Sequence, residues 1–147
     1  MSANSVASFS RCCKALADPT RVRVLRLLAD VSTPLCVCEF KDALEETLYN
    51  VSRHLKELKQ AGFIRGTKSG RWVYHALDPE LSPMHAAMLN AVQLLTDARL
   101  AQDAGRLKKR LRLRQEQRCV IGPAESLRQA QQKMLRKKGK THVRRDI

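Results

Sequence analysis

Apolar residues recur at helical spacing in the first part of the chain, between charged positions that are expected to face solvent. A short helix is predicted over residues 7–16. Asp18 followed by Pro19 is typical of an N-cap and a first helical turn, and predicts a second helix that ends near Asp30. The buried stripe of this second helix recurs every third residue, at Val22, Leu25 and Leu28.

The next two apolar segments predict a helix-turn-helix, because they form two short helices joined by a tight connection. Thr33 and Pro34 suit the N-cap and first turn of a third helix. Thr47 can cap a fourth helix in "LYNVSRHLKELKQAG", which Gly62 would end in a left-handed conformation. The apolar positions of the two helices are Val37, Phe40 and Leu44, then Leu48, Val51, Leu55 and Leu58.

The segment "FIRGTKSGRWVYHAL" predicts a β-hairpin with Ser69–Gly70 in its turn and the basic residues Lys68 and Arg71 at its tip. A longer helix is predicted from about Met84, since apolar residues then recur at spacings of 4, 3, 4 and 3, as in a helix–helix seam. These positions are Met84, Met88, Ala91, Leu95 and Ala98. The fold class is therefore mainly α with a small β-hairpin.

Charge divides the chain in two. Residues 1–105 carry 13 Lys/Arg and 11 Asp/Glu, whereas residues 106–147 carry 15 and 3. We expect one domain over 1–105 and a basic, partly helical or disordered tail over 106–147, with a polyanion such as nucleic acid as partner. No secretion signal is recognisable, and no apolar run approaches the ~20 residues of a membrane span. A cytoplasmic protein without a membrane partner is expected.

Three blocks, in this order, resemble the ArsR/SmtB family of winged helix-turn-helix repressors: "KALADPTRVRVLRLL", "VSRHLKELKQAGFI" and "RGTKSGRWVYHALDP". The resemblance covers about residues 10–100 and implies a transcriptional repressor of the winged helix-turn-helix fold. It also implies a homodimer that pairs through terminal helices, on a double-stranded and roughly palindromic operator. The seam described above would supply the dimer interface, through Met84, Met88, Ala91 and Leu95.

The polar face of the fourth helix offers side chains that suit base edges in the major groove, and the hairpin tip suits contact with the DNA backbone. The candidate DNA-binding residues are Tyr49, Asn50, Ser52, Arg53, His54, Lys56, Lys68 and Arg71. No phosphate-binding glycine loop, nucleophile elbow or catalytic carboxylate pair is recognisable, so we expect neither an enzyme nor an organic cofactor.

The motif "LCVCEF" resembles the third-helix cysteine motif of the arsenic- and cadmium/lead-responsive branches of the family, which implies that Cys36 and Cys38 are metal ligands. Thiolates suit soft ions, and a helix N-terminus is expected to lower the pKa of both thiols. In a regular helix the two side chains would point about 200° apart. We therefore expect that the first helical turn must unwind or bend before both bind one ion.

Lys41 stands where a familiar arsenic-sensor pattern has a third cysteine. The resemblance implies that the N-terminal pair Cys12 and Cys13 completes the site across the dimer, with one of them joining As(III) and both joining a four-coordinate ion. Cys119 is expected to be a buried or incidental thiol, although Arg114 and Arg118 would favour its thiolate. Which of Cys12, Cys13 or Cys119 completes the site stays open on the sequence alone.

The predicted function is a repressor that releases its operator when As(III) or Sb(III) binds these thiolates. Three alternatives stay open on the sequence alone. The inducer could be Cd(II), Pb(II) or Zn(II), or the thiols could respond to oxidation. In a different class, the basic tail could belong to a protein that binds nucleic acid without sequence preference.

Overall fold

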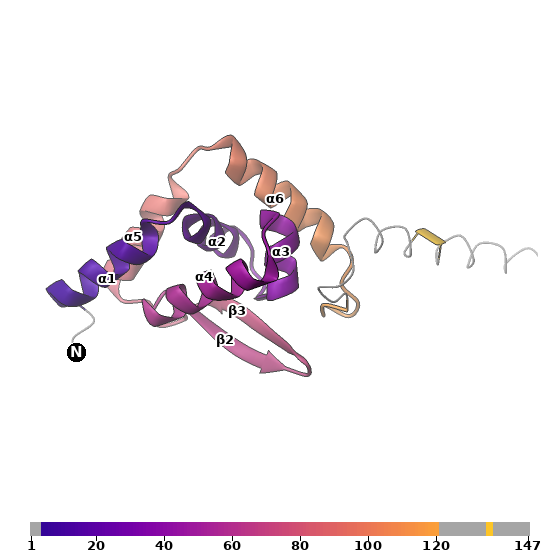
Figure 1. Cartoon of the computed structure of the whole chain (residues 1–147), viewed down its shortest axis with the longest axis horizontal. Helices are drawn as coiled ribbons and strands as arrows, with labels where there is room; N and C mark the ends of the chain where they lie inside the picture. Colours follow the sequence, from indigo (N-terminus) through magenta and orange to yellow (C-terminus); the bar gives the residue numbers. More distant parts are fainter. Residues whose placement is uncertain (1–3, 121–134, 137–147) are drawn as a thin grey trace, which may run out of the picture.

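The structure is a computed structural model that describes residues 4–120 and 135–136. The described part contains one small helical domain with a hairpin that projects from it (Figure 1). The helices are α1 Val6–Leu16, α2 Pro19–Asp30, α3 Val37–Leu44, α4 Leu48–Gln60, α5 Pro83–Gln93 and α6 Ala98–Leu111. The strands are β1 Leu35–Cys36, β2 Ile64–Ser69 and β3 Trp72–Leu77, in the sheet order β1-β3-β2.

Side-chain caps fix the starts of α2 and α4 where the sequence predicted them. Asp18 accepts hydrogen bonds from the backbone N–H groups of Thr20 and Arg21, at 2.8 and 3.1 Å. Thr47 Oγ1 accepts from Asn50 N at 3.2 Å. Each bond satisfies a donor that a helix end would otherwise leave unpaired.

Helix α3 begins later than predicted. Its N-cap is Cys36, with φ −87° and ψ 163°, and not Thr33. Leu35 and Cys36 pair antiparallel with His75 and Tyr74 of β3. This pairing between distant segments holds the chain extended, which overrides the local preference of Pro34 for a helical turn. The expected unwinding of a helical turn that contains both cysteines is therefore wrong, because Cys36 already lies outside the helix.

The predicted hairpin is confirmed, with one change in its turn. Strands β2 and β3 pair from Ile64↔Leu77 to Ser69↔Trp72, which leaves Gly70 and Arg71 as the turn residues. Gly70 has φ +62°, a conformation that favours glycine in a two-residue turn.

The long helix predicted from Met84 is two helices. Helix α5 ends at Gln93, and α6 starts after Asp97, whose side chain accepts a hydrogen bond from Arg99 N at 2.8 Å. The predicted seam is thus interrupted, because Leu95 lies in the connection, where it is 44% exposed. The apolar period carried no sign of this break, which the N-cap at Asp97 produces.

The four residues expected at the dimer interface divide into two groups. Met84 and Met88 are half-buried and pack against the hydrophobic core of their own chain. Ala91 and Leu95 are exposed. Helix α6 runs across residue 105, where the sequence placed a domain boundary, and most of the remaining tail lies outside the described residues.

The core lies between α2, α3 and α4, and includes Val24, Leu25, Phe40, Leu55 and Phe63, each 1% exposed or less. Helix α6 joins this core through charge. The Asp103 carboxylate is fully buried and accepts from Arg23 of α2 at 2.7 and 2.8 Å, and from Arg106 at 2.7 Å. Figure 1 shows α6 lying alongside α3.

Asp103→Asn should lower the free energy of unfolding by about 3–5 kcal/mol, because it leaves the Arg23 guanidinium without its buried counter-charge. Asp30→Asn is the matched control, since the Arg26–Asp30 pair lies at the surface, and it should cost less than about 1 kcal/mol. Urea unfolding followed by circular dichroism measures both. Equal effects of the two substitutions would contradict the assigned role of the buried pair.

His75 should make stability depend on pH. Burial lowers its pKa to about 4, helped by the charge of Lys59. Because the unfolded side chain titrates near 6.5, the unfolded state binds the extra proton between the two values. His75 should therefore contribute no penalty above pH 6.5 and destabilise the fold as the pH falls from 6.5 to 4, by up to about 1.4 kcal/mol per pH unit. The difference between wild type and His75→Gln isolates this slope; parallel curves would refute it.

Candidate functional site

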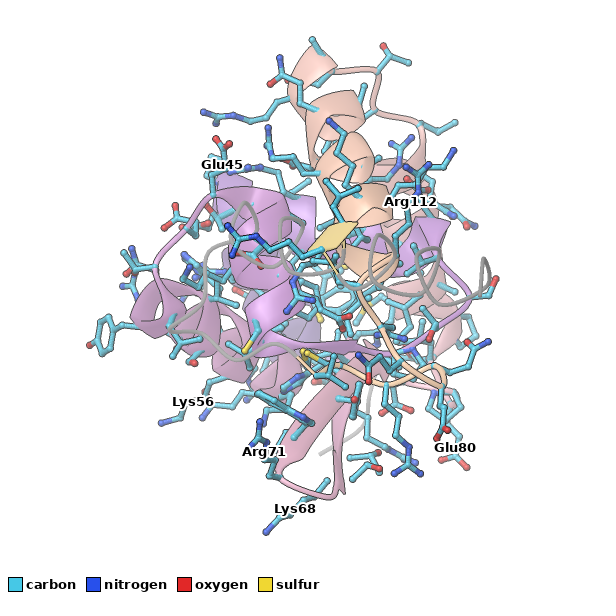
Figure 2. All side chains as sticks on the ribbon, turned by 90° about the vertical axis from the view of Figure 1, so that its right-hand side faces the viewer. Glu45, Lys56, Lys68, Arg71, Glu80 and Arg112 are labelled. Carbon is cyan, nitrogen blue, oxygen red and sulfur yellow. The ribbon has the colours of Figure 1, made fainter. Side chains whose placement is uncertain are left out.

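Helix α4 presents a polar face that suits DNA, because its apolar residues Val51, Leu55 and Leu58 are buried in the core. The exposed residues on that face include Tyr49, Ser52, Arg53 and Lys56. Figure 2 shows Lys56 of α4 projecting from the same side of the molecule as Lys68 and Arg71 of the hairpin. A helix and a basic hairpin on one side form the geometry that can place a helix in a groove with the hairpin along the backbone.

Two of the candidate DNA-binding residues are engaged within the chain. His54 is only 5% exposed, and its Nδ1 lies 3.9 Å from an Asp18 carboxylate oxygen. Its side chain is therefore on the buried face of α4, and we remove it from the candidate DNA-binding residues. Asn50 is half-buried and donates to Glu46 Oε2 at 3.2 Å. Contact between Asn50 and a base would require that bond to be exchanged.

Three cysteines meet beside the first half of β3, close to Trp72 and Tyr74. Cys36, Cys38 and Cys119 are 1%, 4% and 2% exposed and form one buried cluster, against which Trp72 and Tyr74 pack. Cys36 is hydrogen-bonded through its side chain to both Cys119 and Cys38. The sulfur atoms of Cys36 and Cys119 also lie within 4.8 Å of each other and of a Glu39 carboxylate oxygen. Cys36, Glu39 and Cys119 are the one group of three metal-binding side chains within that distance among the described residues, and Cys38 is not part of it.

Cys119 reaches the cluster because the chain reverses after α6. Glu116 and Gln117 have φ values of 51° and 66°, and Gln115 and Arg118 exchange backbone hydrogen bonds at 3.0 and 2.9 Å around them. The backbone N–H of Cys119 then donates to the Tyr74 hydroxyl of β3 at 3.0 Å. The turn thereby returns the chain from α6 to the hairpin.

Two arginines anchor this segment to α3. Arg114 donates to both carboxylate oxygens of Glu39, each at 2.6 Å. Arg110 donates to Asp42 at 2.7 Å and to the sulfur of Cys119 at 3.6 Å. Such paired, charge-assisted bonds are strong and directional. The bonds of Arg110 and Arg114 to α3 therefore determine where Cys119 lies.

The thiols differ in acidity. The hydrogen bond with Cys119 acts to lower the pKa of Cys36, but the bond with Cys38, burial and the charge of Glu39 together raise it to about 12. The hydrogen bond from Cys36 lowers the pKa of Cys38, against burial. The expectation of a lowered pKa is thus wrong for Cys36, because a buried site beside a carboxylate opposes the helix terminus.

The N-terminal cysteines lie elsewhere. Cys12 is 1% exposed, and its sulfur contacts Ala61 O at 3.6 Å and His85 Nε2 at 3.3 Å. A thiol buried in its own chain cannot reach a second subunit without rearrangement of α1, which argues against Cys12 as a ligand across a dimer. Cys13 is exposed on α1.

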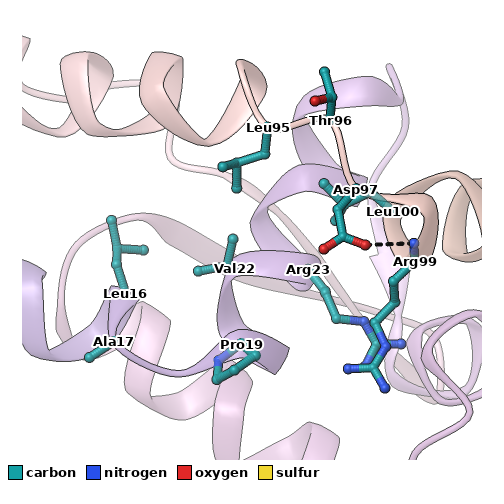
Figure 3. A pocket seen from close by; sticks show the side chains of 10 residues that line it. All are labelled: Leu16, Ala17, Pro19, Val22, Arg23, Leu95, Thr96, Asp97, Arg99 and Leu100. Carbon is teal, nitrogen blue, oxygen red and sulfur yellow. Dashed lines mark hydrogen bonds between the residues drawn. The ribbon is translucent and has the colours of Figure 1, made fainter.

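A pocket of about 570 Å³ lies between the start of α2 and the connection from α5 to α6 (Figure 3). It is lined by apolar side chains such as Val22 and Leu95, together with Arg23 and Asp97. No cysteine lines it, so this pocket is distinct from the thiol cluster. None of the helices in the described residues is long and apolar enough to cross a membrane.

Comparison with known proteins identifies the family. Residues 18–65 match the family described as "Bacterial regulatory protein, arsR family". The arsenic resistance transcriptional regulator ArsR1 of Pseudomonas putida is 43% identical over 94 residues, which are 64% of this chain and 73% of that protein. The chain belongs to the arsR family. As a member, it is a DNA-binding transcriptional regulator of the winged helix-turn-helix fold and not an enzyme.

Two further likenesses support this assignment. The cadmium resistance transcriptional regulatory protein CadC homolog of Staphylococcus aureus is 39% identical to this arsR-family chain over 67 residues, which are 46% of this chain and 54% of that protein. Among solved structures, reduced HlyU from Vibrio cholerae superimposes with a TM-score of 0.50 and 27% identity, over 58% of this chain and 85% of that one.

Cys119 and its supports were not among the site residues predicted from the sequence. A signal was present, since Glu39 and Asp42 lie three residues apart on α3, and Arg110 and Arg114 lie four apart, in the last turn of α6 and just beyond it. Such complementary spacings fit two helices packed side by side. The packing of α6 on α3 depends on contacts between distant segments, so these charges could not be paired in advance.

Lys68→Ala and Arg71→Ala should each weaken binding of this arsR-family protein to duplex DNA of any sequence. Loss of one phosphate contact should reduce the slope of log affinity against log salt by about 0.9. Lys108→Ala, which removes an exposed charge from α6, is the matched control and should leave the slope unchanged. Fluorescence anisotropy at several salt concentrations measures the slopes. Equal slopes in all three variants would remove the hairpin from the DNA interface.

Proposed function

We propose that this protein is a repressor that binds operator DNA as a homodimer and releases it when As(III) or Sb(III) binds Cys36 and Cys38. The observation that carries the proposal is the buried cluster that contains these two thiols at the start of α3. Soft thiolate ligands favour soft ions over hard cations. The printed names of the relatives, one an arsenic and one a cadmium resistance regulator, support an ion of this class.

The site is well placed to affect DNA binding. Cys36 belongs to β1, which pairs with β3 of the hairpin, and it is also the N-cap of α3. Helix α3 leads through residues 45–47 directly to α4, whose polar face is the candidate reader of DNA. An ion bound to Cys36 and Cys38 therefore acts on both elements of the DNA-binding side. A coupling of about 1–3 kcal/mol would change operator affinity about 5- to 150-fold.

A second copy of the chain is the expected partner. Val6, Phe9 and Cys13 recur at helical spacing on α1 and are exposed, with Val6 at 89% and Phe9 at 50%. Leu94 and Leu95, which directly follow α5, are 81% and 44% exposed. Apolar surface of this kind favours burial in an interface. Two-fold symmetry then favours a roughly palindromic operator. A cytoplasmic location accompanies this proposal, since a reducing compartment keeps thiols available to bind an ion.

Two alternatives keep the same architecture. The cadmium-resistance relative favours Cd(II), with Pb(II) and Zn(II) as related thiophilic ions. The contact of Cys36 with two neighbouring thiols favours oxidation to a disulfide. Non-specific coating of nucleic acid is less favoured, because Arg106, Arg110 and Arg114 of the basic segment are paired within the domain.

Arsenite should release the protein from its operator, which selection from random duplexes can define. In a gel-shift titration under reducing conditions, saturating arsenite should lower operator affinity about 5- to 150-fold. The Cys36→Ser/Cys38→Ser variant should bind the operator in the absence of ion and keep it at every arsenite concentration.

Parallel titrations with Cd(II) and with peroxide separate the alternatives. If Cd(II) or peroxide releases the operator and arsenite does not, that agent replaces arsenite as the inducer. A full arsenite response of the double variant would refute the assignment of the two cysteines.

A further inference from the structure

The structure brings a third thiol of the same chain to the proposed ion site. Cys119 lies with its sulfur within 4.8 Å of that of Cys36, and its side chain is hydrogen-bonded to Cys36 as well. We propose that Cys119 supplies the third thiolate, so that each chain by itself holds As(III) or Sb(III) in a three-sulfur site. The identity of the ion rests on the proposed function, whereas the ligand assignment rests on the geometry.

Glu39 is a weaker candidate than Cys38 for a place in this site, although its carboxylate lies close to Cys36 and Cys119. Both of its oxygens already accept from Arg114 at 2.6 Å, and one also accepts from the backbone N–H of Cys36 at 3.0 Å. Using an oxygen as a ligand would break a buried ion pair. A soft ion favours sulfur in any case, so Glu39 is assigned as the residue that holds Arg114 and the start of α3 in place.

A specific backbone turn after α6 places Cys119 beside Cys36. Two residues other than glycine, Glu116 and Gln117, adopt the left-handed conformation in the turn that precedes it. That conformation costs roughly 1–2 kcal/mol per residue, and it persists only where surrounding contacts determine it. The bonds of Arg114 to Glu39 and of Cys119 N to the Tyr74 hydroxyl are such contacts. These contacts would not be required if Cys119 were an incidental thiol in a surface tail.

The charge of the cluster suits a trivalent ion. When arsenous acid reacts with the three thiols, three As–O bonds break and three As–S bonds form. Each thiol proton leaves with a hydroxide as water, and arsenic keeps its oxidation state. The product is neutral, which lowers the cost of burying it in a site where every sulfur is nearly inaccessible. A divalent ion with three thiolates would leave one negative charge, and Arg110 donates to the Cys119 sulfur at 3.6 Å.

Removing the two N-terminal cysteines tests the assignment directly. The chain has five cysteines, so Cys12→Ala/Cys13→Ser leaves only the three of the cluster. X-ray absorption of this variant loaded with arsenite under reducing conditions should show three sulfur ligands, with one ion bound per chain. The affinity of this variant for arsenite should stay within a few-fold of that of the unsubstituted protein, which has all five cysteines.

Cys119→Ser in the same background should show two sulfur ligands. Its arsenite affinity should fall by more than about 100-fold, beyond the 10- to 100-fold range typical of a residue that only supports a ligand. Circular dichroism checks that this variant is folded. If it is not, the sulfur count of the Cys12→Ala/Cys13→Ser protein decides alone, because three sulfurs can come only from Cys36, Cys38 and Cys119.

Two results would overturn the assignment and point to different errors. Two sulfur ligands in the Cys12→Ala/Cys13→Ser protein, with three in the unsubstituted protein, would place the third ligand in α1 and leave the proposed function standing. Failure of the unsubstituted protein to bind arsenite, with operator binding intact, would overturn the proposed function together with the site.

Discussion

A line of charged side chains on α6 fixes the position of that helix, and much of the remaining arrangement depends on it. Asp103, Arg106 and Arg110 follow one another at helical spacing, and Arg114 continues the line beyond the helix end. They contact Arg23, the Ala43 carbonyl, Asp42 and Glu39 in turn. Buried ion pairs of this kind require close geometry, because an unpaired charge in the interior is costly. They therefore specify the register of α6 on α3 more sharply than apolar contact would.

This register changes the meaning of the basic C-terminal composition. Residues 106–120 contain seven Lys/Arg, and three of these, Arg106, Arg110 and Arg114, are bound to carboxylates inside the domain. Those three charges are committed to the fold and contribute little to attraction of a polyanion. Composition alone marks residues 106–120 as part of a basic tail, but this stretch is partly a structural element of the domain. Its ion pairs hold Cys119 beside Cys36.

The sequence predicted those elements that local rules determine. Asp18 and Thr47 cap α2 and α4 as expected, because N-caps act over three residues. The hairpin followed from its turn and strand residues. The start of α3 could not be predicted, because it depends on pairing of Leu35 and Cys36 with a strand some forty residues away. The same holds for His54, whose burial depends on packing against the start of α2. The division of α5 from α6 follows from a local N-cap at Asp97, but the continuous apolar period of the segment concealed it.

The position of Cys36 determines how an ion bound in the cluster would affect the hairpin and α4, the two DNA-binding elements. A cysteine inside a regular helix would need the helix to deform, whereas an N-cap in extended backbone lets its thiol meet Cys38 directly, while its main chain stays paired with Tyr74. With the ion held within one chain, the hairpin and α4 of that same subunit would change together. In a symmetric dimer each subunit then contributes its own coupling. About 1.4 kcal/mol per subunit, tenfold for one half-site, amounts to about a hundredfold for the operator when the two act independently. A modest shift of β3 where it pairs with Cys36 would be enough for release.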